Sequence, residues 1–232
     1  MIEAGDAIGF RGAAPRRPRS LILSSNVDLA WLARGLERHG HEVEVHGSDS
    51  EMPEMVPVAS DSLRADDYQL ILHCHMPTQP SPGPITKLDH AQWAAQCEEP
   101  ARRTLQSLQL AQSHIAANGA IVGLGPAFAL NGTAGLAGFS MALETQRTLV
   151  KSAARQWASR AFSINWVALA PARLVPGLAD ADGIGRFVVG PDLRRPPADE
   201  PIAALLAMLA TGGGAALNGQ TLVADGGEWM VP

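Results

Sequence analysis

The sequence predicts an α/β protein in which helices cover both faces of one doubly wound, mainly parallel sheet. The first observation is a strand, a helix and a strand in close succession, at residues 20–24, 27–39 and 41–46. Such alternation is typical of parallel strands joined by a right-handed crossover. The second is a continuous apolar strand at residues 68–73, as expected in the middle of a sheet covered on both faces. A chain of 232 residues is long enough for one domain of this kind.

Later segments continue the alternation. Pro100 in a first turn and Gly119 just past an end predict a long helix over residues 100–118. Hydrophobic periodicity predicts further strands at residues 120–124, 162–169 and 221–224, and further helices at residues 140–159 and 202–211. Shorter elements are expected near Met55–Val58 (a strand), near Ser60 and near Asp89 (helices).

The N-terminal residues 1–18 are expected to form a flexible lead, and residues 19–232 the domain. The segment from Arg11 to Arg19 contains four arginines and is rich in proline. These charges either contact an acidic surface or, as is more usual for such a run, are simply solvated.

Composition limits the possible partners. The hydrophobic fraction of 46% and the charged fraction of 18% are those of a globular protein with a large core. The formal net charge of -5 argues against nucleic acid as a main partner. No apolar run is long enough to span a bilayer, and the N-terminus lacks the apolar segment of a signal peptide. Two cysteines, Cys74 and Cys97, form no disulfide framework. We therefore expect a cytoplasmic protein without nucleic-acid or membrane partners.

A family resemblance lies in residues 120–171, which read AIVGLGPAFALNGTAGLAGFSMALETQRTLVKSAARQWASRAFSINWVALAP. This stretch resembles the core of the short-chain dehydrogenase/reductase family, and residues 219–227, GQTLVADGG, resemble its closing strand and turn. The resemblance implies a Rossmann-like fold. Catalytic members carry a Tyr-x-x-x-Lys pair, a serine upstream of the tyrosine and an asparagine in the preceding long helix. This chain has, at those four positions, Phe139, Leu143, Pro126 and Pro100. The resemblance therefore implies a degenerate member of the family.

The loss of this chemistry also follows from the residues themselves. Proton transfer to a carbonyl oxygen needs a titratable donor, and a lysine one helical turn away lowers the pKa of a tyrosine for that purpose. Phe139 has the ring without the hydroxyl, and Leu143 has the stem without the charge. The chain has one tyrosine, Tyr68, and two lysines, Lys87 and Lys151, and no Tyr-x-x-x-Lys. We predict no catalytic residues in this chain.

The cofactor turn of the family is written Thr-Gly-x-x-x-Gly-x-Gly, and glycines there let the backbone approach a pyrophosphate. The corresponding residues here, Ser24–Trp31, contain no glycine. Val27 and Leu29 bring bulk, and Asp28 a negative charge, to the expected path of a phosphate. A polar residue within Ser24–Asn26 is expected to cap the next helix. We predict no cofactor-binding residues, and binding of neither NAD nor NADP by this chain.

Two weaker signals concern other ligands. His73, Cys74 and His75 alternate between the two faces of a strand, and no distant partner completes a zinc site. We predict no metal site and a structural role for both histidines. Arg194 and Arg195 either hold an anion such as a coenzyme A phosphate or, as we favour, are surface charges on a loop.

The contrast between lost catalytic residues and retained helices predicts a non-catalytic subunit that assembles with an active short-chain dehydrogenase homologue. NAD or NADP is then expected on the partner subunit. The resemblance implies a heterotetramer that oxidises a hydroxyacyl-CoA, of the kind used in anaerobic toluene degradation. It also implies an interface made by residues 100–118 and 140–159, and a second one made by residues 202–232, where Trp229 is the expected anchor.

Two alternatives remain from the sequence. One is a small-molecule-binding or regulatory module with a pocket near Phe139. The other is an enzyme with unrelated chemistry that uses His73, His75, Asp28 or Glu144, although isolated titratable residues are usually structural.

Overall fold

The computed structural model describes residues 16–48, 67–77, 82–176 and 199–227 of the chain. Six strands in these ranges form one sheet with the order β2-β1-β3-β4-β5-β6, in which every neighbouring pair is parallel. The strands are β1 (Arg19–Ser25), β2 (Glu42–Ser48), β3 (Tyr68–His75), β4 (Ile115–Pro126), β5 (Ser163–Leu169) and β6 (Thr221–Ala224). This sheet confirms the predicted α/β fold class.

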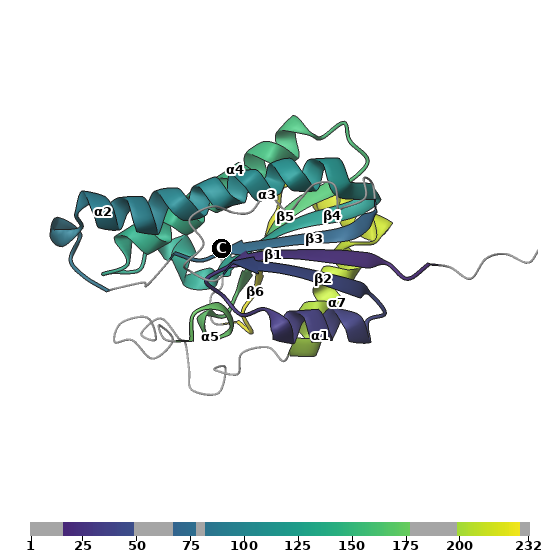
Figure 1. The fold of residues 1–232 in the computed structure, drawn as a ribbon, viewed down its shortest axis with the longest axis horizontal. Helices are drawn as coiled ribbons and strands as arrows, with labels where there is room; N and C mark the ends of the chain where they lie inside the picture. The colour runs from purple at the N-terminus through teal and green to yellow at the C-terminus, as the bar shows by residue number, and fades with distance from the viewer. Residues whose placement is uncertain (1–15, 49–66, 78–81, 177–198, 228–232) are drawn as a thin grey trace, which may run out of the picture.

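Helices cover both faces of the sheet, as predicted (Figure 1). On one face lie α3 (Glu99–His114) and α4 (Ala137–Gln156), and on the other lie α1 (Ala30–Arg38) and α7 (Asp199–Leu209). Shorter elements are η2 (Ile85–Lys87), α2 (His90–Trp93), the π-helical η3 (Ala94–Glu98), η4 (Ala127–Asn131), α5 (Pro171–Leu174) and η7 (Gly212–Leu217). None of the helices in the described ranges is long and apolar enough to cross a membrane.

Alternation along the central strands divides the core into two layers. Leu21 and Leu23 of β1 pack on the same side as Leu108 of α3 and Val150 of α4. Ile22, between them, packs on the opposite side with residues of α1 and α7. The side chains of all three β1 residues are at most 4% exposed, so the strand is buried on both faces. Such double burial explains why its sequence is a continuous apolar run rather than an alternating one.

The end of α3 differs from the prediction. The helix ends at His114, and the residues from Ile115 belong to β4, which pairs with β3. Gly119 was expected just past a helix end, but it lies within the strand. A Cβ there would come within 2.9 Å of the Gln69 carbonyl oxygen, so glycine is needed for close approach of the two strands.

Two other helix boundaries differ from the prediction. Helix α4 begins at Ala137 rather than Ser140, and α1 begins at Ala30 rather than near Val27. The expected short helix near Asp89 is present and starts with a capping box between Asp89 and Gln92. The strand and helix expected near residues 55–60 fall outside the described residues, as do Arg194, Arg195 and Trp229.

Glycines in β4 make room for the largest side chain of the neighbouring strand. A Cβ on Gly125 would lie 2.3 Å from Cζ2 of Trp166, and one on Gly123 would lie 2.5 Å from its Cε3. Trp166 is 2% exposed and belongs to the core on the α3 and α4 side. The Gly-Leu-Gly sequence at residues 123–125 therefore has a packing function here.

Candidate functional site

The position of the family's catalytic tyrosine is filled by a stacked aromatic pair. Phe139, in the first turn of α4, lies against Phe128 of η4 with ring centroids 5.6 Å apart and planes 24° apart. Phe139 is 1% exposed, and so is Leu143, one turn further along the same helix. Both belong to one hydrophobic cluster with Phe128. These groups have no proton to exchange, so this part of the molecule is core.

The two prolines of the predicted replaced set lie in regular structure. Pro126 is the last residue of β4, and Pro100 is buried in the first turn of α3. A proline in a first helical turn costs no hydrogen bond, because the first backbone N–H groups of a helix have no partner within it. Neither residue can replace a serine or an asparagine as a hydrogen-bond donor.

The only tyrosine lies at the opposite edge of the sheet, seven residues before the carboxyl end of β3. The Tyr68 hydroxyl donates to Oε2 of Glu44 at 2.6 Å, and the Arg19 guanidinium lies 4.7 Å from the ring centroid. Burial and the carboxylate of Glu44 raise the pKa of Tyr68 to about 12. Tyr68 is therefore a structural group and a poor proton donor at neutral pH.

The turn after β1 differs from the prediction in its backbone conformation and in the contacts that Asn26 makes. Asn26 adopts a left-handed conformation with φ of 58°, which glycine would provide in a glycine-rich turn. Its Nδ2 donates to the Met76 carbonyl at 2.8 Å, and the Met76 amide donates to the Ser25 carbonyl. Asn26 therefore ties the ends of β1 and β3 together instead of capping α1.

The bulky and charged residues of this turn do not fill the space beside it. Leu29 is 2% exposed and belongs to the core. Asp28 is exposed, and its Oδ1 accepts a hydrogen bond from the backbone amide of Ala30 at 2.8 Å. The acceptor at the start of α1 is thus Asp28, not a residue of Ser24–Asn26.

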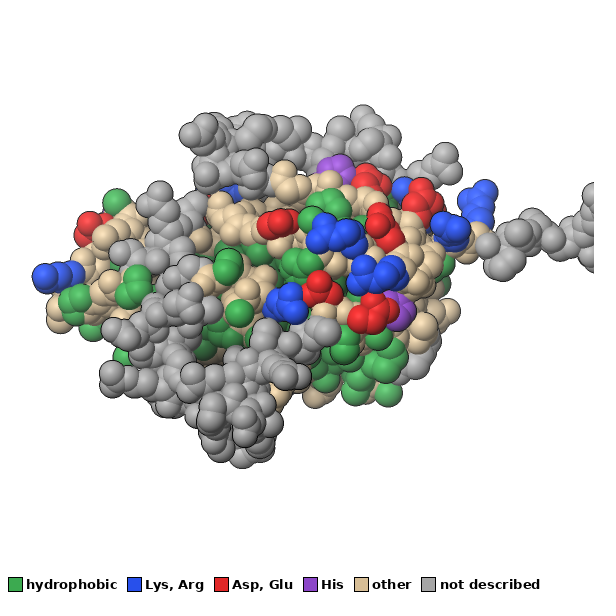
Figure 2. Space-filling model, turned by 90° about the horizontal axis from the view of Figure 1, so that it is seen from below, with side chains coloured by type: hydrophobic (Ala, Val, Ile, Leu, Met, Phe, Trp, Pro, Cys, Tyr) green, Lys and Arg blue, Asp and Glu red, His purple; other side chains and the backbone are tan. Residues whose placement is uncertain are grey.

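A pocket of about 910 Å³ lies beside the turn. Its walls come from the end of β1 and the turn after it, α1, β2, and α5 with the residues that follow it: Ser24, Ser25, Asn26, Val27, Asp28, Leu29, Ala30, Ala33, Arg34, Glu37, Val45, Gly47, Leu174 and Pro176. Figure 2 shows that the face carrying α1 mixes positive and negative side chains rather than gathering one sign. Binding of an anion in the pocket would therefore depend on individual side chains. Among those that line the pocket, Arg34 forms no ion pair with any described residue.

A buried network of hydrogen-bonded side chains lies next to this pocket, at the carboxyl edge of the sheet. His75 is 2% exposed, and its Nδ1 lies 2.9 Å from the Ser25 Oγ while its Nε2 lies 2.7 Å from the Ser107 Oγ. The Gln146 Nε2 donates to the His75 carbonyl, and the Thr104 Oγ1 donates to the Gln146 Oε1. This hydrogen-bond network links β1, β3, α3 and α4, so it fixes Ser25 at the pocket wall.

Both histidines of β3 are neutral groups of the interior. Burial lowers the pKa of His73 to about 4, and burial followed by the nearby His73 and Arg103 lowers that of His75 well below its usual value. His75 uses both ring nitrogens on serine hydroxyls, whereas neither nitrogen of His73 has a hydrogen-bond partner in the part of the chain that the structure describes. Within the described ranges, no three His, Cys, Asp or Glu side chains come together to hold a metal ion.

The other residues considered for unrelated chemistry have local structural partners. Glu144 forms an ion pair with Arg147 on the same helix, and Asp28 accepts from the α1 backbone. Neither lies in a hydrogen-bonded pair with a nucleophile among the described residues, as such an enzyme would need.

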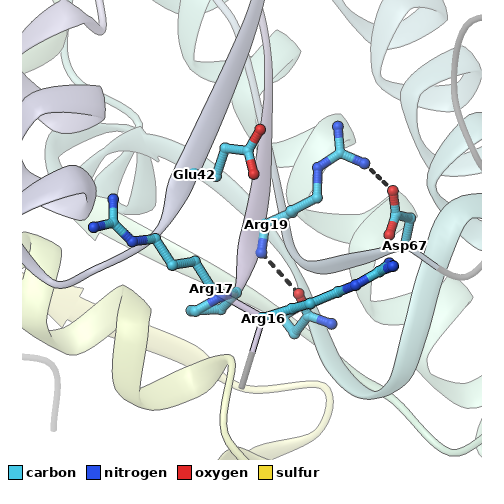
Figure 3. Close-up of a pocket in the computed structure, with 7 residues that line it drawn as sticks. Arg16, Arg17, Arg19, Glu42 and Asp67 are labelled. Carbon is cyan, nitrogen blue, oxygen red and sulfur yellow. Dashed lines mark hydrogen bonds and ion pairs between the residues drawn. The ribbon is translucent and has the colours of Figure 1, made fainter. Parts of the chain in front are cut away.

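A second pocket, of about 710 Å³, opens at the amino edge of the sheet, where Arg16 and Arg17 lead into β1. Figure 3 shows their side chains directed to opposite sides of the strand, so the two guanidinium groups do not converge on one point. Arg19 is paired with Asp67 and Glu44, and Glu42 adds a further carboxylate to the wall. This arrangement favours the solvated interpretation of the basic lead.

The sheet order, the helices on both faces and the pocket after β1 together define a Rossmann-like α/β protein. The profile of a family described as enoyl-(acyl carrier protein) reductase matches residues 32–228. The chain belongs to the short-chain dehydrogenase/reductase family. Among curated proteins, no relative matches the sequence.

Solved structures share the fold at low identity. A short-chain dehydrogenase from Burkholderia cenocepacia in complex with NADP has 18% identity and a TM-score of 0.69, covering 91% of this chain and 97% of its own. A dehydrogenase/reductase from Sinorhizobium meliloti has 17% identity and a TM-score of 0.68, covering 93% and 96%. A blue fluorescent protein from a metagenomic library, in complex with NADPH, has 18% identity and a TM-score of 0.65, covering 92% and 99%.

The prediction that this chain binds no dinucleotide is wrong. Proteins of the same fold hold NADP or NADPH, as the Burkholderia and metagenomic structures do. The prediction required Val27, Asp28 and Leu29 to block the turn, yet these residues line a pocket with Leu29 turned into the core. The absence of glycine was therefore not a sufficient criterion, because Asn26 adopts the left-handed backbone in its place.

Proposed function

We propose that this chain is a nucleotide-holding but non-catalytic subunit of a short-chain dehydrogenase complex, in which an active homologue performs the oxidation. The observation that carries the proposal is the stacked pair of Phe128 and Phe139. Together with Leu143, this pair places hydrocarbon where the family needs a proton donor and its cation. The chain keeps the family's fold and lacks a group that could protonate a carbonyl oxygen there.

The pocket after β1 is the site that we assign to a dinucleotide of the kind held by the structural relatives. The left-handed Asn26 fits it, because this backbone leaves the turn open, and the volume of about 910 Å³ leaves room for a nucleotide. Arg34 is the side chain that we assign to a phosphate contact. When bound, the dinucleotide supplies hydride chemistry in this family, but Phe139 and Leu143 offer it no proton partner. The residues of this chain would therefore bind and orient the nucleotide only.

The outer faces of α3 and α4 are the partner contact that we assign. Leu105 on α3 and Met141 on α4 are large apolar side chains exposed to 45% and 38%, and a partner could cover them. Leu108 and Val150 on the same helices are 3% and 0% exposed and belong to this chain's own core. Substitutions at those two positions would therefore test folding, whereas Leu105 and Met141 test assembly.

The experiment is co-purification of the full chain from its native host, followed by sizing and an NAD(P)-dependent activity assay. We expect an active homologue at equal stoichiometry in a heterotetramer, as symmetric assembly favours. Leu105→Asp with Met141→Asp should separate the two chains, and Ile85→Asp, at a side chain exposed to 70% on η2, is the matched control. A partner that is fully active and never co-elutes with this chain would overturn the proposal.

The narrower proposal within this class concerns the substrate. It is the inactive subunit of the dehydrogenase that oxidises a (hydroxyphenylmethyl)succinyl-CoA in anaerobic toluene degradation, and its support is the family resemblance of residues 120–171. The purified complex should reduce NAD with that acyl-CoA. If it oxidises another hydroxyacyl-CoA instead, the narrower proposal fails and the subunit role stands.

A second candidate function is a ligand-binding or regulatory module, and the pocket after β1 favours it as well. Its ligand site would lie there and not near Phe139, which is packed in the core. The two candidates differ in assembly. A homo-oligomer that purifies alone with nucleotide bound would select the regulatory module.

A further inference from the structure

A third pocket, of about 500 Å³, lies between α4 and the segment that leads into β6. Its walls on the helix are Thr148, Lys151, Ser152, Ala154, Arg155 and, just past the helix end, Ala158, and its walls on the segment are Asn218, Gly219 and Gln220. The segment directly precedes β6, so this pocket lies at the amino edge of the sheet. The pocket after β1 lies at the carboxyl edge, and the two are therefore separate sites.

Helical spacing brings the polar groups of this pocket together. Thr148, Ser152 and Arg155 follow one another at intervals of four and three residues, and Lys151 is four residues before Arg155, so all lie on one side of α4. All four are exposed. Each brings hydrogen-bond donors, because hydroxyl, ammonium and guanidinium groups all donate.

The charge in this pocket is of one sign. Lys151 and Arg155 are both cationic, and none of the residues that line the pocket is Asp or Glu. Neither side chain forms an ion pair with a described residue. Like charges four residues apart on a helix repel each other, and a bound anion would remove that repulsion.

The facing wall is held in place by hydrogen bonds. The Asn218 Oδ1 accepts from the Ile164 amide at 2.9 Å, its Nδ2 donates to the Ala154 carbonyl at 3.3 Å, and the Gly219 amide donates to the Ile164 carbonyl at 2.8 Å. Gly219 has φ of 76°, a conformation that glycine adopts without strain. A site built on a helix and a fixed turn needs little reorganisation to bind a ligand.

We propose that this pocket binds the phosphate group of a small soluble molecule. Lys151 and Arg155 would provide the charged contacts, with Arg155 able to donate two parallel hydrogen bonds to phosphate oxygens. Thr148 and Ser152 would donate from their hydroxyls. No redox or group-transfer step is involved, and the site does not depend on the nucleotide role. Thr148 and Ser152 follow Met141 by seven and eleven residues on the same face of α4, so phosphate binding and the proposed partner contact would compete for this face.

The test is titration of the full chain with inorganic phosphate, followed by ³¹P line broadening and calorimetry, and with glycerol phosphate as a second arm. Lys151→Ala and Arg155→Ala should each weaken phosphate binding about ten-fold, and the double variant should abolish it. Lys151→Arg with Arg155→Lys keeps both charges and should retain binding. Arg102→Ala, which removes an exposed arginine from α3, is the matched control and should change binding less than two-fold.

The outcomes distinguish a specific phosphate site from general electrostatic attraction of phosphate to the protein surface. The proposal is overturned if the wild-type chain binds no phosphate at a phosphate concentration of about 10 mM, which is high enough to detect even a weak site with a Kd of about 1 mM. So does an equal loss in Arg102→Ala, or binding by the double variant within two-fold of wild type. Thermal midpoints within a few degrees of wild type show that the variants are folded. Tighter binding of glycerol phosphate than of inorganic phosphate assigns the site to an ester.

Discussion

Phe139 lies face to face with Phe128 at a centroid distance of 5.6 Å, in the place where a catalytic member of this family needs an ionisable ring. One turn later Leu143 completes the apolar surface. Because all three belong to one buried cluster, restoring the catalytic residues means inserting polar groups into a packed core.

The first prediction follows from that packing. Phe139→Tyr with Leu143→Lys should give no reductase activity, and Leu143→Lys alone should lower the free energy of unfolding by about 3 kcal/mol or more, because it buries an unpaired ammonium. Met141→Lys, on the exposed side of the same helix, should stay within about 0.5 kcal/mol of wild type. Urea unfolding and a nicotinamide oxidation assay measure both effects. An active double variant would contradict the non-catalytic assignment.

The second prediction concerns the turn after β1. The isolated chain should bind NADPH or NADH in calorimetry, and Asn26→Val should weaken that binding about ten-fold or more, because a β-branched residue is strained at a φ of 58°. Asn26→Gly, which tolerates the same backbone, should bind within about three-fold of wild type. Equal binding by the valine and glycine variants would show that the turn does not form the site.

The third prediction is a loss of stability in acid. The pKa of His73 is lowered by burial from 6.5 to about 4, so the unfolded chain takes up its proton first as the pH falls. Stability is therefore retained above pH 6.5 and decreases between pH 6.5 and 4, by about 3 kcal/mol from this residue. The pKa of His75 shifts in the same direction and adds to the effect.

Chemical unfolding at several pH values measures this dependence. His73→Leu should reduce the slope of the pH profile to the part due to His75, without loss at pH 7, because neither ring nitrogen of His73 has a hydrogen-bond partner among the described residues. His90→Gln, at an exposed histidine on α2, is the control and should leave the slope unchanged. A wild-type profile that is flat between pH 6.5 and 4 would show that these histidines are accessible to protons in the folded state.

The fourth prediction tests how Trp166 of β5 packs against the glycines of β4. Gly125→Ala places a Cβ 2.3 Å from the indole Cζ2, so it should lower the free energy of unfolding by about 1–3 kcal/mol. Gly83→Ala, where no atom lies within 4 Å of the added Cβ, is the control and should be nearly neutral. A second substitution, Trp166→Leu, should remove part of the cost of Gly125→Ala, and a strictly additive double variant would exclude this contact as its cause.

Most of the fold was predictable because the apolar segments have clear periods. The run at residues 68–73 and the helical repeat before Gly40 both became elements at the expected places. Boundaries were less predictable. Ile115 leaves the α3 helix because its backbone pairs with Tyr68 of β3, and a long-range pairing of this kind leaves no mark on local spacing.

One part of the candidate site could be predicted from the sequence, and another part could not. The missing ionisable groups at Phe139 and Leu143 are a matter of covalent structure, so the sequence alone was sufficient to identify them. The pocket after β1 was missed, because its presence depends on where Leu29 points and on the backbone of Asn26. The Ser-Ser-Asn sequence contained one usable signal, since asparagine tolerates the left-handed region better than most residues.

By itself, the sequence determined the parallel α/β architecture and the absence of the family's proton-transfer groups, because periodicity and side-chain chemistry are local properties. Only the tertiary structure decided that Phe128 meets Phe139, that Leu29 turns into the core and that Lys151 and Arg155 face a fixed turn. Side-chain directions in turns, and contacts between distant segments, are set by how the whole core packs, which no local pattern specifies.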